Sequence, residues 1–344
     1  MEKLTNETLT EELNEAITSL MTEAGITEQR GLIRRILAAG IGLGQDDAGR
    51  LDLKITSAAI EEMRAAFRLF APHHGVPKVS IFGSARTHSN DPLWLSAEAT
   101  ARGLADQGWF VVTGAGPGIM EAAATGAGSE HSLGVSIRLP FEEHPNATVA
   151  EKDRLVSMKY FFTRKLMLVK ESSGFVCLPG GFGTLDETLE LLTLQQTGKM
   201  IPVPIVLLDR PGGSFWRGFA QFAMKEMAGT GMISIDDLDR VLITDSVEEA
   251  IAEITGFWRN YDSLRWAGDR LILRLHRELN DAEMASLNEH FSGLCLDGGI
   301  ERTEPLEVEH DERDLLGLPR IILTPRPRAV GELHRLIRAI NQFG

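Results

Sequence analysis

Short apolar runs alternate with turns and helical patterns through the middle of the chain. Each run has the length of a buried strand and ends in glycine, proline or polar residues. The runs lie at residues 79–82, 110–113, 133–137, 175–178, 203–208 and 241–244. Helical patterns lie near 93–107, after the turn at 114–121 and up to residue 127, at 158–170, at 214–228 and at 246–258. This alternation predicts an α/β fold, a Rossmann-like doubly wound parallel sheet with helices on both faces, over residues 76–261.

Helical patterns without strands precede this domain. Residues 1–75 predict an N-terminal helical extension. Its two apolar stripes are Leu32, Ile33, Ile36 and Leu37, and Ile60, Met63, Phe67 and Phe70. The glycine-rich stretch 40–44 between the stripes is not followed by a helix pattern, and we expect a turn there.

The pattern changes again after residue 261. Residues 262–344 predict a small α+β appendage. Its two strands are expected at 270–275 and 319–324, and its two helices at 281–291 and 329–340. The acidic segment 301–314 is expected to be solvated.

The apolar run at 175–178 breaks into a Pro-Gly-Gly-Phe-Gly sequence, and the next helix is expected to begin near Thr184. Glycines at the start of a helix leave backbone N–H groups uncovered, and these donors suit a phosphate, as does the positive end of the helix dipole. No Gly-Lys-Ser/Thr follows, so this is not a Walker loop. The residues expected to form a phosphate site are Pro179, Gly180, Gly181, Gly183 and Thr184.

Glu187 has two interpretations. In Thr184-Leu-Asp-Glu187 the hydroxyl and the carboxylate can each satisfy a backbone donor, as in a capping box. The alternative is a catalytic carboxylate. Spacing alone favours capping, because capping boxes are common and catalytic glutamates are few. The repeat of Leu185, Leu189 and Leu192 predicts one buried face for the helix.

The segment upstream favours the catalytic interpretation. Residues 158–170 predict a helix in which Arg164 and Lys165 lie off the buried face, which is marked by Phe162, Leu166 and Val169. A Pro-Gly-Gly-x-Gly-Thr-x-x-Glu motif preceded by such an Arg-Lys helix resembles the LONELY GUY (LOG) family. These proteins are phosphoribohydrolases that release the base from a nucleoside 5'-monophosphate.

The resemblance covers roughly residues 76–260 and implies that Arg164 and Glu187 are the catalytic pair. It also implies a homodimer, with the Arg-Lys helix near the interface. Proteins of this kind are often labelled lysine decarboxylases. No pyridoxal-phosphate lysine motif stands out in this sequence, so we do not expect that activity.

Two further turns match the family. Gly83-Ser84-Ala85 resembles its first turn, although a serine after a strand is often only a helix cap. Residues 114–124 resemble a turn that commonly reads Gly-Gly-Gly-Pro-Gly-Ile-Met-Glu-Ala-Ala-Asn, with Ala115 and Ala124 in place of a glycine and the asparagine. The residues that the resemblance adds to the substrate site are Gly83, Ser84, Gly114, Gly116, Gly118, Met120, Glu121, Glu142 and Lys165.

Three details limit how far the resemblance reaches. Shorter family members usually have Met-His ahead of the arginine, whereas this chain has Phe161-Phe162-Thr163, like longer bacterial members, which weakens any inference about a bulky cytokinin base. For Glu142, a surface-loop carboxylate is an equal alternative. Residues 114–118 read G-x-G-x-G rather than G-x-G-x-x-G, and no acidic residue closes the strand at 133–137. The match to an NAD site is therefore weak, and an NAD-dependent oxidoreductase is a third, weaker alternative.

Hydrolysis of an N-glycosidic bond passes through a ribose with oxocarbenium character at C1′ and needs a water to attack that carbon. Glu187 is expected to stabilise the charge and to orient or deprotonate the water. Arg164 would clamp the substrate or ease departure of the base, and Lys165 would neutralise the phosphate. The expected products are a free base and ribose 5-phosphate, with no metal or redox cofactor. The alternative is a non-catalytic nucleotide or cofactor carrier or sensor on the same fold.

The composition of the chain indicates which kinds of ligand and partner it can bind. The formal net charge of −14 disfavours a nucleic-acid-binding surface but leaves room for a small anion held by local cations. The nine histidines lack H-x-H and H-E-x-x-H spacing, so no metal site is expected. No apolar stretch has the length of a bilayer span and the polar start lacks a signal-peptide core, which favours a cytoplasmic protein. Cys177 and Cys295 are expected to be reduced thiols.

Overall fold

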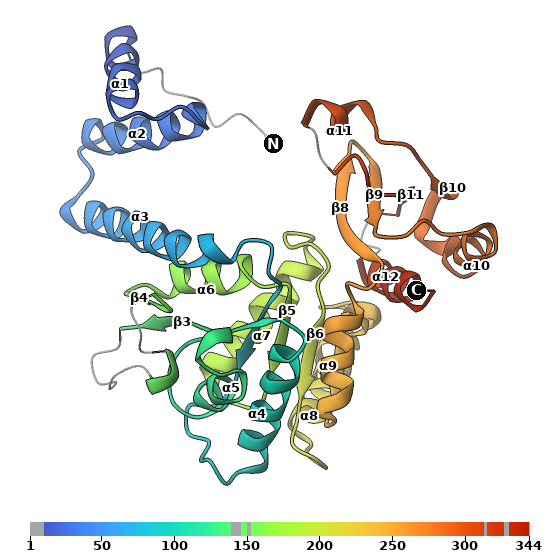
Figure 1. Cartoon of the computed structure of the whole chain (residues 1–344). Helices are drawn as coiled ribbons and strands as arrows, with labels where there is room; N and C mark the ends of the chain where they lie inside the picture. Colours follow the sequence, from blue (N-terminus) through green and yellow to red (C-terminus); the bar gives the residue numbers. More distant parts are fainter. Residues whose placement is uncertain (1–9, 139–145, 150–152, 313–314, 327–329, 344) are drawn as a thin grey trace. The chain divides into compact units, whose positions relative to one another are not determined.

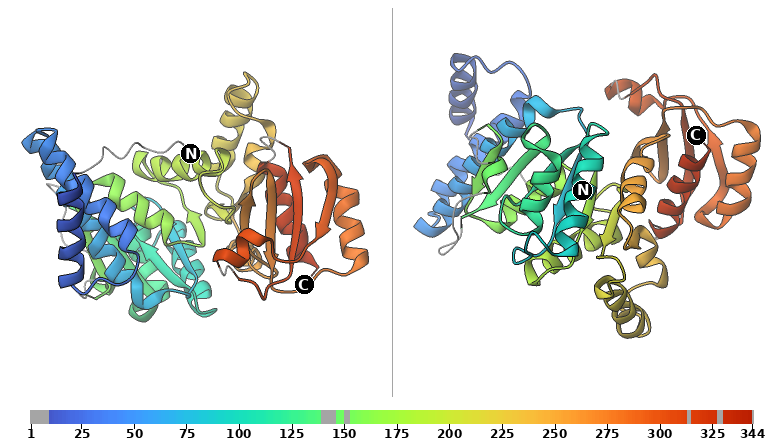
Figure 2. Two further views of the ribbon diagram at one scale, coloured as in Figure 1. Left: turned by 90° about the horizontal axis from the view of Figure 1, so that it is seen from above. Right: turned by 60° about the horizontal axis from the view of Figure 1, so that its bottom comes forward.

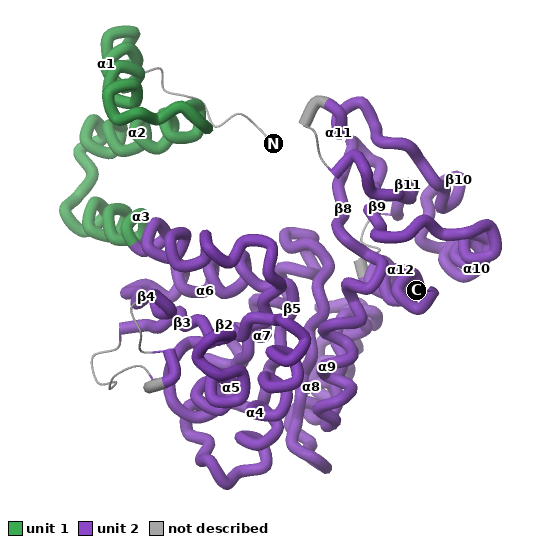
Figure 3. The backbone as a smooth tube through the Cα atoms, viewed as in Figure 1, with its two compact units in different colours: residues 1–61 green, residues 62–344 purple. Residues whose placement is uncertain are grey.

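The computed structural model describes residues 10–138, 146–149, 153–312, 315–326 and 330–343. It divides the chain into two compact units, residues 1–61 and residues 62–344 (Figure 3).

The smaller unit is helical, which confirms the N-terminal helical extension. It contains α1 (Glu11–Glu23), α2 (Arg30–Gln45) and the first part of α3 (Arg50–Phe70). The turn expected at residues 40–44 is wrong, because these glycines lie inside α2. The N–H of Asp46 still bonds to the Gly42 carbonyl at 2.8 Å, and α2 ends where Asp47 takes a φ of 51°. The apolar stripe of α2 is not buried either, since Leu32 and Ile36 are exposed.

Seven parallel strands form the main sheet of the larger unit, in the order β4-β3-β2-β1-β5-β6-β7 (Figure 1). Six of them confirm the predicted runs: β1 (Lys78–Phe82), β2 (Phe110–Thr113), β3 (Ser132–Ile137), β5 (Gly174–Cys177), β6 (Ile205–Leu208) and β7 (Val241–Thr244). The seventh, β4 (Leu155–Met158), was not predicted. It is a short edge strand in which the exposed Ser157 interrupts the apolar pattern.

Successive side chains of each strand point alternately into two apolar layers, one on each face of the sheet, as a sheet covered on both faces requires. In β5, for example, Val176 points to one layer and Phe175 to the other. The first layer contains α4 (Pro92–Ala105), α5 (Ile119–Ala127) and α9 (Val247–Gly256). The second contains the end of α3, α6 (Phe161–Lys170), α7 (Phe182–Gln196) and α8 (Phe215–Phe222). The Rossmann-like doubly wound fold is therefore confirmed.

A second sheet follows, with four antiparallel strands in the order β10-β11-β9-β8 (Figures 1 and 2). The strands are β8 (Tyr261–Ala267), β9 (Arg270–Leu275), β10 (Cys295–Arg302) and β11 (Arg320–Pro325). Helices α10 (Asp281–Phe291) and α12 (Val330–Gln342) share an apolar core with it. This confirms the α+β appendage, while the boundaries expected at 75 and 261 stay predictions. Strand β8 was missed because Asp262 and Arg265 break its apolar pattern, and β10 because it contains two glycines and an irregular register.

The sequence predicts that the acidic segment 301–314 is solvated, and this prediction is wrong for part of the segment. Glu309, in the short helix α11 (Glu307–Glu312), is fully buried. Its Oε1 lies 2.8 Å from Nη2 of Arg274 and 2.8 Å from Nη1 of Arg320. A buried carboxylate needs such counter-charges. They come from two neighbouring strands, β9 and β11, so the charge pattern of the segment alone could not reveal them.

Cys177 and Cys295 are buried free thiols, as predicted. Across the described ranges, no helix combines the length and the apolar character that a bilayer span requires.

Candidate active site

Three glycine turns meet at the carboxyl ends of β2, β1 and β5, which are neighbours in the sheet. The backbone of Ser84 joins them. Its N–H donates to the Pro179 carbonyl at 3.2 Å, and its own carbonyl accepts from the N–H of Ile119 at 3.0 Å. The strand order runs outward in both directions from β1, and ligands bind at such switch points of open α/β sheets.

The glycines nearest Ser84 are required by the close approach of these turns. A Cβ on Gly118, which has a φ of 69°, would lie 2.3 Å from the Ser84 carbonyl oxygen. A Cβ on Gly83 would lie 2.6 Å from the side chain of Ile119, and one on Gly180 would lie 2.2 Å from Thr184 Oγ1. Packing alone therefore accounts for these three glycines.

Helix α7 begins earlier than predicted. Gly181 is its N-cap and Phe182 its first residue, so Thr184 lies inside the helix and Glu187 in its second turn. The capping box expected for Thr184 and Glu187 is therefore wrong. This removes the structural interpretation that had competed with catalysis.

The buried face predicted for α7 is confirmed in part, because Leu185 and Leu192 pack against the core and Leu189 does not. Leu189 is 44% exposed, whereas Thr184, Thr188, Leu191 and Gln195 are buried. Polar side chains can be buried here because they are hydrogen-bonded. Thr188 Oγ1 donates to the Thr184 carbonyl at 2.8 Å, and Gln195 Nε2 donates to the Val203 carbonyl at 2.8 Å.

The start of α7 is open to solvent. A Cβ on Gly181 or Gly183 would meet no atom within 4 Å, and the ring of Phe182 between them is 94% exposed. Backbone N–H groups at an uncovered helix N-terminus are donors for an anion. This is the segment in which the sequence predicts a phosphate site.

Arg164 of α6 and Glu187 of α7 form an ion pair, with 3.1 Å between Nη1 and Oε1. The guanidinium also donates from Nε to the Val135 carbonyl at 3.0 Å. On its other side, Nη2 would lie 2.1 Å from a Cβ on Gly114. The second glycine turn, the middle of β3 and α7 therefore all fix the position of this one side chain.

The buried face predicted for α6 is wrong for Phe162 and Leu166, although Val169 packs against the core as predicted. Phe162 and Leu166 are 53% and 48% exposed, whereas Thr163, Arg164, Met167 and Leu168 are buried. Arginine occupies the inward face because its charge is matched there by a carboxylate and a carbonyl. Apolar periodicity cannot detect such a face.

Glu187 is only 14% exposed, and burial raises its pKa above the ordinary value. The charges of Arg164 and Lys165 oppose this by lowering the pKa, whereas Asp186 and Glu190 raise it further. A carboxyl with a raised pKa is better matched to proton transfer near neutral pH. Behind it, burial raises the pKa of Cys177 to about 12, so that thiol stays protonated.

Lys165 is paired with α7 rather than exposed to the glycine turn. Its Nζ lies 2.6 Å from Asp186 Oδ2 and 3.1 Å from Glu190 Oε2. Burial alone would lower the pKa of Lys165, but its hydrogen bonds to these two acids raise it. Its expected contact with a phosphate stays a prediction, and would compete with this pairing.

The second glycine turn forms despite its substitutions. Ala115 takes a φ of 58°, a conformation that suits glycine better, and the buried Ala124 packs in the same small cluster. Sequence reasoning missed Asn146, which braces this turn. Its N–H donates to the Ala115 carbonyl at 2.9 Å and its Nδ2 to the Gly116 carbonyl at 3.1 Å. No spacing in the sequence links Asn146 to a turn so far upstream.

The remaining predicted residues lie around the same turns. Met120 is folded over the second turn, since its Cε would lie 2.7 Å from a Cβ on Gly116. Glu121 is half-buried in the first turn of α5. Ser84 Oγ accepts from the N–H of Arg86 at 3.1 Å, which is a local turn contact and not a helix cap. Glu142 lies outside the described residues.

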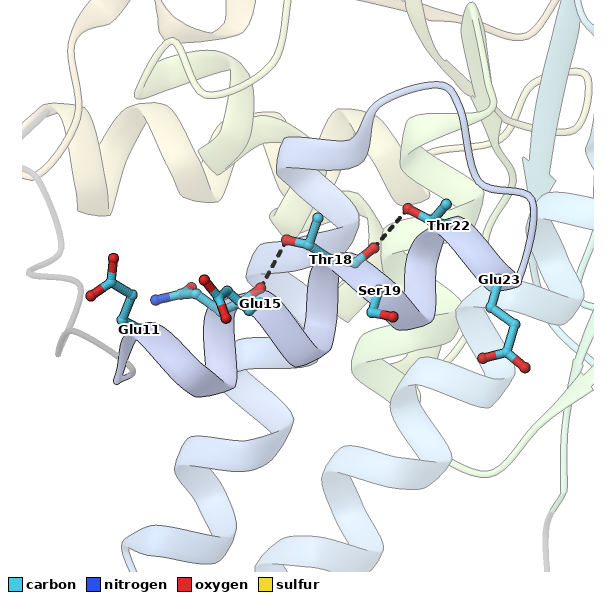
Figure 4. A pocket seen from close by; sticks show the side chains of 7 residues that line it. Glu11, Glu15, Thr18, Ser19, Thr22 and Glu23 are labelled. Atoms are coloured by element: carbon cyan, nitrogen blue, oxygen red, sulfur yellow. Dashed lines mark hydrogen bonds between the residues drawn. The ribbon is translucent and has the colours of Figure 1, made fainter.

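A shallow hollow elsewhere on the surface does not fit the same chemistry. It follows α1 and is lined by Glu11, Asn14, Glu15, Thr18, Ser19, Thr22 and Glu23 (Figure 4). Its three carboxylates disfavour a phosphate. In the part of the chain that the structure describes, no group of three or more His, Cys, Asp or Glu side chains could hold a metal ion.

Known proteins are similar to the central part of this chain. A family described as "possible lysine decarboxylase" matches residues 118–254. The cytokinin riboside 5'-monophosphate phosphoribohydrolase of Mycobacterium marinum is 31% identical over 156 residues, which are 45% of this chain and 81% of that protein. The protein of the same name from Mycobacterium tuberculosis is 29% identical over 174 residues, or 50% of this chain and 90% of that protein. Among solved structures, the molybdenum cofactor binding protein of Rippkaea orientalis is 23% identical to this chain, with a TM-score of 0.38. The match covers 53% of this chain and 97% of that protein, and the likeness is too small to bear on ligands.

Proposed function

This chain belongs to the LONELY GUY (LOG) family, and from that premise we propose that it hydrolyses the N-glycosidic bond of nucleoside 5'-monophosphates, such as AMP or N6-modified AMP. The products would be a free base and ribose 5-phosphate. The observation that carries the proposal is the buried pair of Arg164 and Glu187, 3.1 Å apart beside the three glycine turns. Curated relatives are named for the same reaction on cytokinin riboside 5'-monophosphate.

Glu187 is the group proposed to act at C1′. The transition state of the reaction carries positive charge at that carbon, and a fixed carboxylate stabilises it electrostatically. The same carboxylate can orient the attacking water and take its proton, for which its raised pKa suits it. Glu187 does not cap α7, so capping does not account for its burial.

Arg164 is proposed to act on both Glu187 and the substrate. Its charge favours the ionised form of Glu187, which burial alone would disfavour. Its hydrogen bond to the Val135 carbonyl holds the guanidinium in place before substrate arrives. The arginine can then clamp the sugar or ease departure of the base without a reorganisation cost.

The start of α7 is proposed to grip the 5′-phosphate. The open space beside Gly181 and Gly183, at the N-terminus of α7, suits that anion. Fixing the phosphate there would hold C1′ against Glu187, one helical turn further along, so that binding energy from a remote group is used for positioning. Such an enzyme would prefer nucleotides to nucleosides.

The decisive experiment measures release of free base from AMP, CMP, GMP and N6-modified AMP by the wild-type chain and by Glu187→Gln. Glutamine keeps the size of the side chain and removes its negative charge. We expect turnover of at least one nucleotide by wild type and a loss of about 10²-fold or more in the variant. Full activity of Glu187→Gln would refute the role of the carboxylate. Binding of nucleotides by wild type without any release of base would favour the carrier or sensor instead.

The family resemblance also supports a homodimer or a higher homo-oligomer formed through α6 and α7. Phe162 and Leu166 on α6 and Phe182 and Leu189 on α7 are exposed apolar side chains. The ion pairs of Lys165 with Asp186 and Glu190 hold the two helices side by side. Exposed apolar side chains that lie on neighbouring helices are typical of interaction sites.

A further inference from the structure

The first turn of α6, which carries Arg164, has no cap from its own chain segment. Tyr160 is the N-cap residue, and its side chain makes no capping hydrogen bond. The N–H groups that begin a helix need partners, and a helix end without them frays. Arg164 is the fourth residue of α6, so fraying there would move the guanidinium.

Glu62 of α3 does not bind these N–H groups but holds the chain on both sides of the N-cap residue, at Lys159 and at Thr163. It is a buried carboxylate, 6% exposed, and Oε1 accepts from the N–H of Lys159 at 2.7 Å. Its Oε2 accepts from Oγ1 of Thr163 at 2.7 Å, immediately before Arg164 in the chain. The two ends of one carboxylate therefore hold both sides of the α6 start.

The charge of Glu62 is matched mainly by α6 itself. Arg138, the cation found near it, has a side chain that is 65% exposed and lies 3.7 Å away. A negative charge at a helix N-terminus is stabilised by the helix dipole. Burying a carboxylate costs free energy that an apolar residue in the same place would avoid. A carboxylate at this position is thus explained by the helix end it holds, and not by packing.

We propose that Glu62 is a positioning residue that sets the place of Arg164 through the first turn of α6. Thr163, the residue directly before Arg164, is the side chain through which Glu62 acts on this turn. The effect of Glu62 on catalysis rests on the proposed function, whereas its contacts with Lys159 and Thr163 are independent of that function.

The first test compares Glu62→Ala, Glu62→Gln and Glu61→Ala in base release. Glutamine can accept from the Lys159 N–H through its amide oxygen. Its NH2 group can donate to Thr163 Oγ1. The Thr163 hydroxyl can then donate its own proton to the Tyr160 carbonyl, which lies 2.9 Å away. We expect Glu62→Ala to lower kcat about tenfold or more with KM changed less than about threefold, since the phosphate grip is elsewhere. Glu62→Gln should restore most of kcat. Glu61→Ala removes an exposed carboxylate from the same helix and should act as wild type.

The second test needs no substrate. Amide hydrogen exchange of residues 159–164 should be about tenfold faster or more in Glu62→Ala than in wild type, with residues of β1 and α4 unchanged. Glu62→Gln should retain protection. Wild-type exchange in folded Glu62→Ala would overturn the proposal, as would equal loss of kcat in the alanine and glutamine variants. If wild type releases no base from any nucleotide, the proposed function fails, and the exchange experiment alone still decides whether Glu62 holds α6.

Discussion

Replacement of Gly114 by alanine tests whether the position of the Arg164 guanidinium matters to the reaction. The added Cβ would lie 2.1 Å from Nη2 of Arg164 and 2.8 Å from Sδ of Met120. Non-bonded heavy atoms settle at about 3.5 Å, so the guanidinium has to withdraw by about 1.4 Å. The φ of Gly114 is outside the left-handed region, so the backbone accepts alanine and only space is lost.

The consequences for activity and for stability should differ. A withdrawal of that size breaks the 3.1 Å contact between Arg164 and Glu187. A misplacement of about 1 Å costs about 10²-fold in rate, which corresponds to about 2.7 kcal/mol of transition-state stabilisation. The atoms displaced are the ends of two long side chains, so the free energy of unfolding should fall by only about 1 kcal/mol, the low end for overpacking.

The assay is kcat/KM on the best nucleotide of the panel, together with the urea midpoint of each variant. Gly218→Ala is the matched control, because a Cβ there meets no atom within 4 Å and Gly218 lies in α8, away from the glycine turns. We expect the control to keep wild-type activity. A folded Gly114→Ala protein with wild-type kcat/KM would show that the guanidinium need not occupy its observed place, and would remove Arg164 from the mechanism.

Three further predictions follow from other contacts. A catalytic base must be ionised, so kcat/KM should fall as the pH drops through the raised pKa of Glu187, and an acid limb at or below the ordinary glutamate value of 4.5 would contradict this. Glu309→Gln leaves two arginines buried without their carboxylate, and should lower the free energy of unfolding by about 3 kcal/mol in urea titrations; a loss under about 1 kcal/mol would mean that the triad is not coupled. Leu166→Glu places a charge on the exposed face of α6 and should convert a dimer to monomers in light scattering, whereas an unchanged mass would place the interface elsewhere.

The main sheet could be predicted because parallel strands buried on both faces are continuous apolar runs. Six of its seven strands, including the edge strand β7, have such a run in their sequences. The strands that escaped prediction have other surroundings. Strand β4 is at an edge, β8 mixes charges into its pattern, and β10 is interrupted by Gly298 and Gly299.

The candidate site was found from a family motif, and its local surroundings were predicted less well. The inward faces of α6 and α7 carry Thr163, Arg164, Thr184 and Thr188, which a search for apolar periodicity assigns to solvent. Thr163, Arg164 and Thr188 each have a specific hydrogen-bond partner, which comes from a distant part of the chain or from the preceding turn. The same reason hid Glu62, since its partners Lys159 and Thr163 are 97 and 101 residues away in sequence.

The burial of Arg164 follows from where β2 stops. Thr113 and Gly134 are the last partner pair of β2 and β3, and Val135 is the next residue of β3. Beyond that pair β2 has turned away at Gly114, so the Val135 carbonyl takes its hydrogen bond from Nε of Arg164. A glycine is needed at the turn because any side chain would occupy the guanidinium's place. The end of a strand, a glycine and an arginine thus depend on one another. Glu187 lowers the cost of keeping that charge buried until substrate arrives, and Glu62 holds the start of the helix that carries it.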